Sequence, residues 1–463
     1  MLSAININFT IIKYFNYLIL GLRGLVIARI LGPYYLGLYS LFLLYQQYLL
    51  YSNLGVQYTL SVELSKKSNS ENEIEKYVGS TFIINGISII ILLTFFVCTY
   101  FSSYKLFTEE NLSLSLLLII NTFLFNSQDI FINIFRTKNK LYLIALLEII
   151  SSVVIFCVVP FFKGMVLVKT ILVVSSILLV FTNLVFWVQF KRIKFNLKYV
   201  QNIFLLSIPF VLYHFFYNLL FMGLRSYIAY FYSYDIVGNF SFAYNIISIF
   251  LLLTNSITWI AYPKVIGILS DKSYSDTNVI PYLAYLVKSI FLLQLILSFF
   301  AFISSPFIFY FFPEYVLARN FFYMLLFCNM YVGILFPFVT YHLSRNNYWK
   351  LFYNSLAALA AGSAFLYSIY IFKLELIWAL FAYLITLFLY FNLLVRDLKI
   401  QLNLDFFDYK SGYSILIQFF IILPSLFALY SYNLFAFYIL VILVIYYIKD
   451  YFNFIKTLKN SLV

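Results

Sequence analysis

Long apolar runs, separated by short polar segments, occupy almost the whole chain. A helix that crosses a bilayer needs about 20 mostly apolar residues, and the sequence holds fourteen runs of this kind. They are residues 9–31, 37–62, 78–101, 112–135, 141–162, 166–190, 203–231, 237–262, 281–303, 317–343, 350–372, 376–395, 412–431 and 433–455. The longest polar linkers, at 65–76, 264–280 and 396–412, are too short for a soluble domain. The pattern therefore predicts an all-α integral membrane protein with about 14 transmembrane helices.

The composition supports this class and excludes others. Hydrophobic residues make up 64% of the chain and charged residues only 10%, whereas a soluble globular protein is about 45–50% apolar and about 25% charged. Sequence motifs for nucleotide binding, metal binding or nucleophilic catalysis are also absent. We therefore expect a transporter rather than an enzyme, with no metal and no other cofactor.

The basic residues are distributed unevenly between the loops on the two sides of the membrane. A net charge of +13 would suggest a nucleic-acid partner in a soluble protein, but membrane proteins concentrate Lys and Arg on the cytoplasmic side. With the N-terminus in the cytoplasm, 21 of the 30 basic residues fall on the inner side, six on the outer side and three within spans. This distribution predicts fourteen spans with both termini cytoplasmic and no nucleic-acid partner.

Two segments of the chain echo each other. VIARILGPYYLGLYS at 26–40 and YIAYFYSYDIVGNFS at 227–241 align at a shift of 201 residues. The coinciding residues are Ile27, Ala28, Gly37 and Ser40 with Ile228, Ala229, Gly238 and Ser241. Transporters are often built from duplicated bundles, so we expect two six-helix lobes, residues 1–198 and 199–396. Residues 397–463 would add helices 13 and 14.

Several local motifs carry a resemblance to a known family. They are ARILGPYYLGLYS (28–40), QYLLYSNLGVQYTLSVELSKK (47–67), SIPF (207–210), IVGNFSFAYNI (236–246) and FFPEYVLA (311–318). Together they resemble polysaccharide-export proteins, which include the O-antigen and capsule repeat-unit flippases of the multidrug/oligosaccharidyl-lipid/polysaccharide superfamily. The match covers most of the chain. It departs from the family pattern at Pro313, where a glycine is common before the acidic residue.

The resemblance implies a V-shaped, MATE-like pair of lobes in a bacterial inner membrane. Such proteins move an undecaprenyl-diphosphate-linked oligosaccharide across the bilayer by alternating access, for surface polysaccharide such as O-antigen in lipopolysaccharide. It also implies partners, namely the polysaccharide polymerase and the chain-length machinery. Two alternatives stay open. One is a MATE-type drug efflux transporter, and the other is a membrane glycan polymerase or ligase, although the short outer loops leave little room for catalytic residues.

Arginines within predicted spans are candidates for substrate binding, because a charge in hydrocarbon is costly. Arg23 lies in the first span, and Asn16 lies seven residues before it on the same helix face. Arg225 lies in the seventh span, with Asn218 seven residues before it and His214 four before that. A polyprenyl diphosphate is anionic, and arginine offers it a planar, bidentate and permanently charged donor.

Each of these arginines has a structural alternative. It can pair with a nearby carboxylate and hold helices together, or it can extend along its helix to the headgroups. Lys288, near the start of the ninth span, is a weaker substrate-binding candidate because it is close enough to the interface to extend there.

Two carboxylates within spans, Asp129 and Glu148, are candidates for coupling transport to a gradient of Na⁺ or H⁺. Asp129 belongs to a polar stripe with Asn126 and Asn133 on one helix face. The alternative is that each carboxylate neutralises a neighbouring basic residue. Uncharged amides also recur in the second and eighth spans, where they would bind sugar hydroxyls or join helices. They are Gln46, Asn53, Gln57, Asn239, Asn245 and Asn255.

Overall fold

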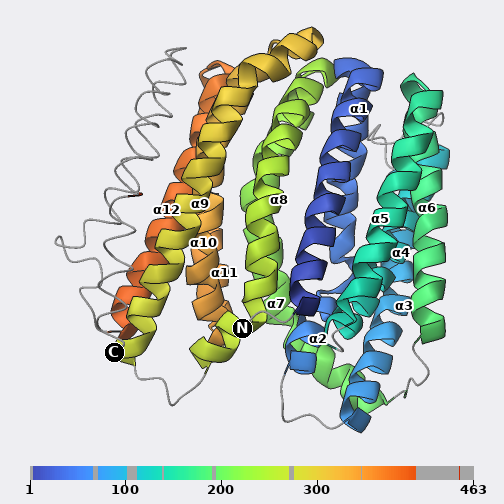
Figure 1. Cartoon of the computed structure of the whole chain (residues 1–463), viewed down its shortest axis with the longest axis vertical. Coiled ribbons are helices and arrows are strands. Elements are labelled where there is room, and N and C mark those ends of the chain that lie inside the picture. Colours follow the sequence, from blue (N-terminus) through green and yellow to red (C-terminus); the bar gives the residue numbers. More distant parts are fainter. Residues whose placement is uncertain are drawn as a thin grey trace. The chain divides into compact units, whose positions relative to one another are not determined.

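The computed structural model describes residues 4–65, 71–101, 112–137, 140–189, 194, 196–270, 276–345, 347–402 and 448. These residues are almost entirely helical, and no strand occurs among them (Figure 1). Ten helices in this part of the chain are long and apolar enough to cross a membrane. The chain is therefore an all-α, multi-pass membrane protein. The predicted spans 412–431 and 433–455 lie outside the described residues except for residue 448, so the number fourteen stays a prediction.

The chain divides into two compact units. Unit 1 comprises the described residues of Met1–Phe215 and Ala229–Gly238, and unit 2 comprises those of Phe216–Ile228 and Asn239–Val463. The division falls within α7 (Leu197–Phe231) and α8 (Tyr234–Ser270). The lobe boundaries predicted from the sequence, at residues 198 and 396, stay predictions.

Unit 1 is a group of helices packed around α4. Its elements are α1 (Ala4–Leu49), η1 (Leu50–Asn53), α2 (Val56–Ser65), α3 (Glu71–Phe101), α4 (Leu112–Thr137), α5 (Leu141–Val158), η3 (Val159–Phe161), α6 (Gly164–Gln189), most of α7 and the start of α8. α4 packs against α6, α3 and α2, while α1 packs against α5, which lies beside it in Figure 1. One apolar cluster shows how α4 is held, because Phe131 and Phe135 both stack on Phe186 of α6.

The first two predicted spans are separated by a kink at Gly32 and Pro33. α1 runs through both limbs, but Gly32 has a φ of 66° and a ψ of 175°, which are not helical values. Glycine adopts a positive φ without steric cost, and the following proline disfavours helical geometry in the residue before it. The break between residues 31 and 37 that the apolar pattern predicts is confirmed.

The second predicted span, 37–62, is not continuous, so this part of the prediction is wrong. The helix ends in η1, and Leu54 and Gly55 then adopt left-handed φ values of 54° and 69° before α2 begins. The Asn53 side chain stabilises the turn, because its Oδ1 accepts a hydrogen bond of 2.9 Å from the Gly55 N–H. A Cβ on Gly55 would lie 2.9 Å from the Val211 Cβ, so glycine also permits close approach of α7.

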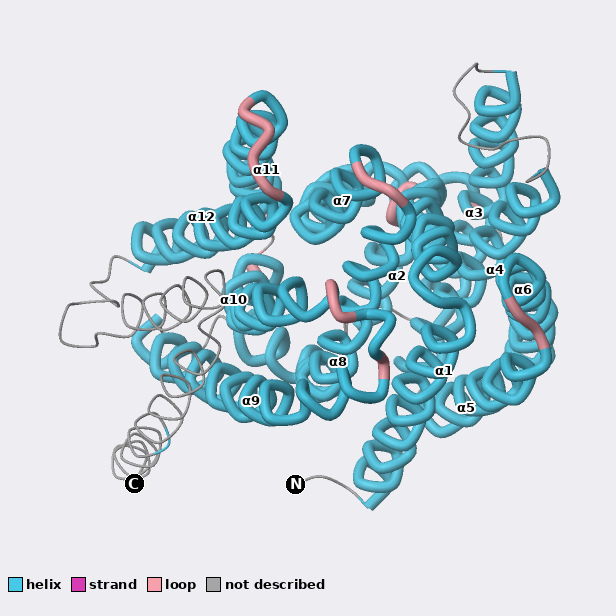
Figure 2. The backbone as a smooth tube through the Cα atoms, turned by 90° about the horizontal axis from the view of Figure 1, so that it is seen from above, coloured by secondary structure: helices cyan, strands magenta, loops and turns pink. Residues whose placement is uncertain are grey.

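Unit 2 is organised around α10. Its elements are the Phe216–Ile228 part of α7, most of α8, α9 (Asp276–Phe311), η4 (Pro313–Tyr315), α10 (Ala318–Ser344), α11 (Tyr348–Ile371) and α12 (Leu376–Leu402). α10 packs against both α9 and α12, and Figure 2 shows it between them. Almost every residue of α10 is buried, which explains why its sequence is apolar on all sides.

Several helices extend beyond the predicted apolar runs. α3 begins at Glu71 rather than at residue 78, α9 covers Asp276–Phe311 rather than 281–303, and α12 continues to Leu402 rather than to 395. Hydropathy identifies only the part of a helix that fits the hydrocarbon, whereas helical hydrogen bonding continues through polar residues outside it. The linkers are correspondingly shorter than predicted.

The two echoing segments meet within unit 1. A Cβ on Gly37 would overlap the backbone carbonyl of Tyr234, and a Cβ on Gly238 would overlap the backbone carbonyl of Pro33. At the shift of 201 residues, Gly37 corresponds to Gly238 and Pro33 to Tyr234, so the contact is made reciprocally by equivalent positions. The rings of Tyr34 and Tyr234 also pack edge to face, with centroids 5.5 Å apart. Glycine at both positions is required by this close approach.

Candidate functional site

Arg23 lies on α1 as a partly accessible cation. Its side chain is half-buried, and the phenol of Tyr39, on the other limb of α1, lies within electrostatic range. It forms no hydrogen bond or ion pair with any residue that the structure describes. The adjacent Gly24 has no heavy atom within 4 Å of where its Cβ would be. Substrate binding by Arg23 stays a prediction.

Asn16, two helical turns before Arg23, is instead engaged with α5. Its Nδ2 donates a 3.2 Å hydrogen bond to Oε2 of Glu148, and its Oδ1 accepts one of 2.9 Å from the Ser152 hydroxyl. Asn16 is only 2% exposed. The structure therefore brings together one predicted substrate residue and one predicted coupling residue, in an arrangement that joins two helices.

The polar stripe of α4 packs against α2 and η1. Asn126 accepts a 3.1 Å hydrogen bond from Asn53, and Asn133 donates one of 3.3 Å to the backbone carbonyl of Gln57. One turn further along, Arg136 donates to the Ser61 hydroxyl and to Asn133. Asn53 and Gln57 of the second predicted span therefore take part in joining helices, which is the second of the two roles considered for those amides.

Asp129 is the member of the stripe that is left unpaired. It is half-buried and lies within electrostatic range of Tyr58. It forms no hydrogen bond or ion pair with a described residue, so it does not neutralise the basic residues at the end of α4. A carboxylate in this condition can accept a proton or a cation.

His214 lies at the junction of α7 with α2. Its ring stacks on Tyr58 with centroids 3.8 Å apart and planes 8° apart. Its backbone carbonyl accepts a 3.0 Å hydrogen bond from the Tyr51 hydroxyl. Two turns earlier on α7, the Ser207 hydroxyl lies 2.9 Å from that of Thr59. The structure brings His214 into a packed helix junction, where it contacts Tyr58.

The predicted site residues that belong to unit 2 are Arg225, Asn218 and Lys288. The Arg225 guanidinium lies 5.0 Å from the centroid of the Tyr244 ring on α8, a cation–π contact. Asn218 is half-buried two turns away on α7, and Lys288 on α9 is only 6% exposed. Sequence reasoning found both arginines but missed their tyrosine neighbours, Tyr39 and Tyr244, because tyrosine is abundant throughout the chain.

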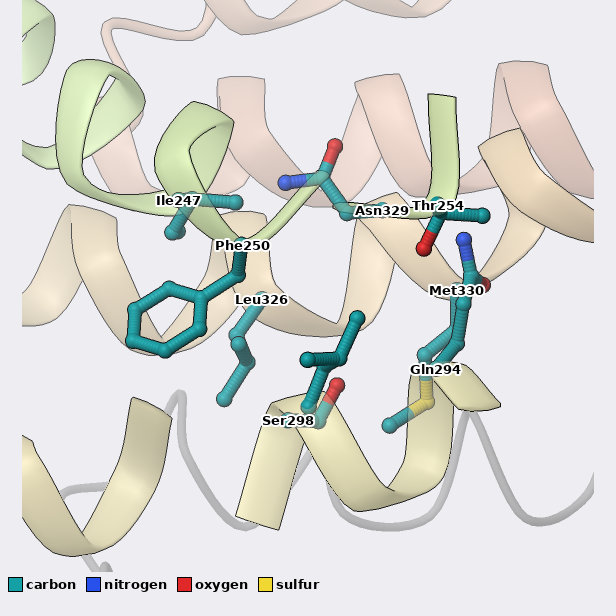
Figure 3. A pocket seen from close by; sticks show the side chains of 9 residues that line it. Ile247, Phe250, Thr254, Gln294, Ser298, Leu326, Asn329 and Met330 are labelled. Carbon is teal, nitrogen blue, oxygen red and sulfur yellow. The ribbon is translucent and has the colours of Figure 1, made fainter. Parts of the chain in front are cut away.

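Sequence reasoning also missed a small polar cavity in unit 2. Four uncharged polar side chains line it, and Figure 3 shows most of its wall. They are Thr254 on α8, Gln294 and Ser298 on α9, and Asn329 on α10. A sequence signal did exist, since Gln294 and Ser298 are four residues apart and therefore share a helix face. Among the described residues, no cluster of three or more His, Cys, Asp or Glu side chains could hold a metal ion.

Sequence comparison identifies one family. Residues 6–266, more than half of the chain, match the profile of a family described as "Polysaccharide biosynthesis protein". No curated protein sequence matches the chain.

Structural comparison finds solved transporters over nearly the full length. The lipid II flippase MurJ, in an inward closed conformation, is 19% identical with a TM-score of 0.67, and the match covers 98% of this chain and 99% of that one. A Vibrio cholerae MATE transporter is 13% identical with a TM-score of 0.60, covering 86% and 97%. A MOP-superfamily transporter from Pyrococcus furiosus is 15% identical with a TM-score of 0.56, covering 85% and 95%. The chain therefore has a MurJ- and MATE-like fold.

Proposed function

Because this chain belongs to the polysaccharide biosynthesis protein family, we propose that it is a flippase for a polyprenyl-diphosphate-linked oligosaccharide. The cargo would be the undecaprenyl-linked repeat unit of a surface polysaccharide, O-antigen or capsule. Alternating access would carry it from the inner to the outer side of the bacterial inner membrane. The family and the MurJ-like fold support this class of cargo, and the site residues support the chemistry of its head group.

The observation that carries the proposal is the unpaired guanidinium of Arg23. Charged side chains within spans are rare and almost always have a partner, yet half-buried Arg23 has no hydrogen bond or ion pair among the described residues. A diphosphate supplies the missing partner, because its oxygens match the planar fork of arginine in bidentate hydrogen bonds. A neutral or cationic cargo would leave the charge of Arg23 uncompensated.

Arg225 would provide the second cationic group. It occupies a place in α7 comparable to that of Arg23 in α1, at a shift of 202 residues. The ring face of Tyr244 contacts the guanidinium and restricts the side chain. We propose that Arg225 also binds an anionic group of the cargo, with Asn218 and Lys288 as secondary contacts. Asn16 and His214 would act through the packing of α1 and α7 and not by touching cargo.

Asp129 would couple transport to an ion gradient. It is half-buried and has no hydrogen bond or ion pair among the described residues, whereas Glu148 already accepts a hydrogen bond from Asn16. We therefore assign the exchange of Na⁺ or H⁺ to Asp129 rather than to Glu148. Both termini would be cytoplasmic, and the polysaccharide polymerase and chain-length machinery would receive the cargo on the outer side.

MATE-type drug efflux is the second candidate function. The similarity to MATE structures and the unpaired Asp129 favour it, since a carboxylate suits a cationic drug. The unpaired Arg23 opposes it, because a cation repels such a substrate.

The test uses a cell that needs this protein for its surface glycan. Arg23→Ala and Arg225→Ala should each reduce export strongly at equal protein level in the membrane, and Arg→Lys variants should recover only part of it. Arg29→Ala is the matched control, because Arg29 lies on the same helix but is exposed. Unchanged export in both alanine variants would refute the anion-binding role, and drug resistance that depends on Asp129 would favour efflux.

A further inference from the structure

The polar cavity between α8, α9 and α10 holds hydrogen-bonding groups that lack partners. Neither atom of the Gln294 amide has a hydrogen bond to a described residue, and neither has the Thr254 hydroxyl. The side chains of Ser298 and Asn329 also form none within the described chain. All four residues are at most 9% exposed. Buried polar groups in native proteins are normally paired, so several orphans in one cavity indicate a guest that is not part of the chain.

The cavity is a feature that the packing maintains. The Gln294 amide lies directly over Gly333 of α10, where any side chain larger than hydrogen would overlap it. Gly333 therefore makes the space that lets Gln294 lie across α10, beside the wall residue Met330. In Figure 3 the amide nitrogen of Gln294 points toward the hydroxyl of Thr254 across the cavity. The orphan groups converge on one space and do not scatter along the helices.

The balance of donors and acceptors defines the chemistry of the guest. The two amides offer N–H donors and carbonyl acceptors, and the two hydroxyls offer both. A cation would leave the amide N–H groups unpaired, and an anion would leave the carbonyl oxygens unpaired. No charged side chain lines the cavity that could compensate either ion. The guest is therefore neutral and carries groups that both donate and accept, which is the property of hydroxyls.

The size and the lining of the cavity further restrict which molecules can bind there. Its interior is about 20 Å³, enough for one or two groups the size of water, since one such group needs about 10–15 Å³. The remaining wall is apolar, with Phe250, Ile247 and Leu326 among its residues. A sugar edge fits this description, because its hydroxyl or hydroxymethyl groups enter the interior while its C–H face lies against apolar side chains.

We infer that Thr254, Gln294, Ser298 and Asn329 form a subsite for the hydroxyl groups of one sugar. The inference rests on the proposed function, because it takes the sugar to belong to the lipid-linked oligosaccharide. It assigns to unit 2 a contact with the glycan that is chemically separate from the contact of arginines with the diphosphate.

The test measures binding of free monosaccharides to the full chain in lipid nanodiscs. Saturation-transfer NMR with N-acetylglucosamine and galactose should give a signal for wild type with at least one sugar. Gln294→Leu and Asn329→Leu should each weaken that binding about fivefold to tenfold, as expected for loss of one or two hydrogen bonds. Gly333→Ala should weaken it as well, because it displaces Gln294. Ser363→Ala on the exposed face of α11 and Gly86→Ala on α3 are controls that should bind as wild type.

Two results would overturn the inference. The first is that neither sugar binds to wild type, in which case water alone fills the cavity. The second is that the variants bind the sugar as well as wild type does. Thr254→Val, which keeps the side-chain shape, serves if a leucine variant does not fold. Binding of undecaprenyl diphosphate is measured on the same samples. It should be retained in the Gln294 and Asn329 variants and lost in Arg23→Ala, so failure of the sugar subsite and failure of the diphosphate site give different results.

Discussion

Because Gly37 and Gly238 make a reciprocal close contact, replacing either by alanine should destabilise the protein. The same replacement at an ordinary helical glycine should stabilise it. Gly37→Ala and Gly238→Ala each place a methyl group against a backbone carbonyl, of Tyr234 and Pro33 respectively. A backbone atom cannot rotate away, so the two segments must move apart. Forced overpacking of this kind costs about 1–3 kcal/mol. Gly86→Ala is the reference, because Gly86 has no heavy atom within 4 Å of its Cβ position, and alanine in a helix interior is favoured by about 0.5–1 kcal/mol.

The assay is thermal unfolding of the purified variants in one detergent, followed by the loss of monodisperse protein. Gly37→Ala and Gly238→Ala should each lower the apparent midpoint, whereas Gly86→Ala should leave it unchanged or raise it. The double variant Gly37→Ala/Gly238→Ala should cost less than the two single effects together, because one separation relieves both overlaps. If Gly37→Ala and Gly238→Ala are as stable as Gly86→Ala, the two echoing segments do not meet as described.

Three further predictions concern the remaining polar groups. Asn16→Leu removes the hydrogen bonds to Glu148 and Ser152 and should destabilise the protein by roughly 0.6–2 kcal/mol, seen as a lower midpoint in the same unfolding assay; an unchanged midpoint would contradict the helix-joining role. Tyr244→Leu removes the ring that holds Arg225 and should reduce glycan export about threefold to tenfold. Tyr244→Phe, which keeps the ring face, should export as wild type does, and equal losses in both variants would argue against a cation–π role. Asp129→Asn should abolish the dependence of export on an imposed Na⁺ or H⁺ gradient in proteoliposomes, and retained gradient dependence would exclude Asp129 as the coupling group.

The hydropathy pattern predicted most of the described fold, because the bilayer sets the length and polarity of each span. It located the break at Gly32, where glycine and proline interrupt an apolar run. It did not locate the break at Leu54 and Gly55, because the residues on both sides stay apolar and the turn depends on the Asn53 side chain and on close approach of α7. The helix ends were predicted too short wherever a helix continues into polar residues.

The candidate site was predictable only where a single residue is conspicuous. A charge in an apolar run identified Arg23, Arg225 and Asp129 from sequence. The partners of Asn16 and His214 were not predictable, because Glu148 and Tyr58 come from helices distant in the chain. The same limit applies to the polar cavity of unit 2. Its four polar residues are unremarkable one by one and gain their meaning from sharing one space.

The internal repeat was only partly predictable from the sequence. The echo between 26–40 and 227–241 was visible in the sequence, and it predicted an internal duplication. That the equivalent glycines contact each other's segments required the structure, because sequence similarity gives equivalence of positions and not their distance.

The central claim is that Arg23 binds the diphosphate of a lipid cargo, and a comparison of two lipids tests it most directly. Binding of undecaprenyl diphosphate and of undecaprenol, which lacks phosphate, is measured to wild type, Arg23→Ala and Arg29→Ala in nanodiscs. We predict that wild type and Arg29→Ala bind the diphosphate much more tightly than the alcohol. Arg23→Ala should lose about 10- to 100-fold of the diphosphate affinity, as expected for charge-assisted hydrogen bonds worth about 1.5–3 kcal/mol. Equal affinity of wild type for the two lipids, or unchanged diphosphate binding in Arg23→Ala, would contradict the account.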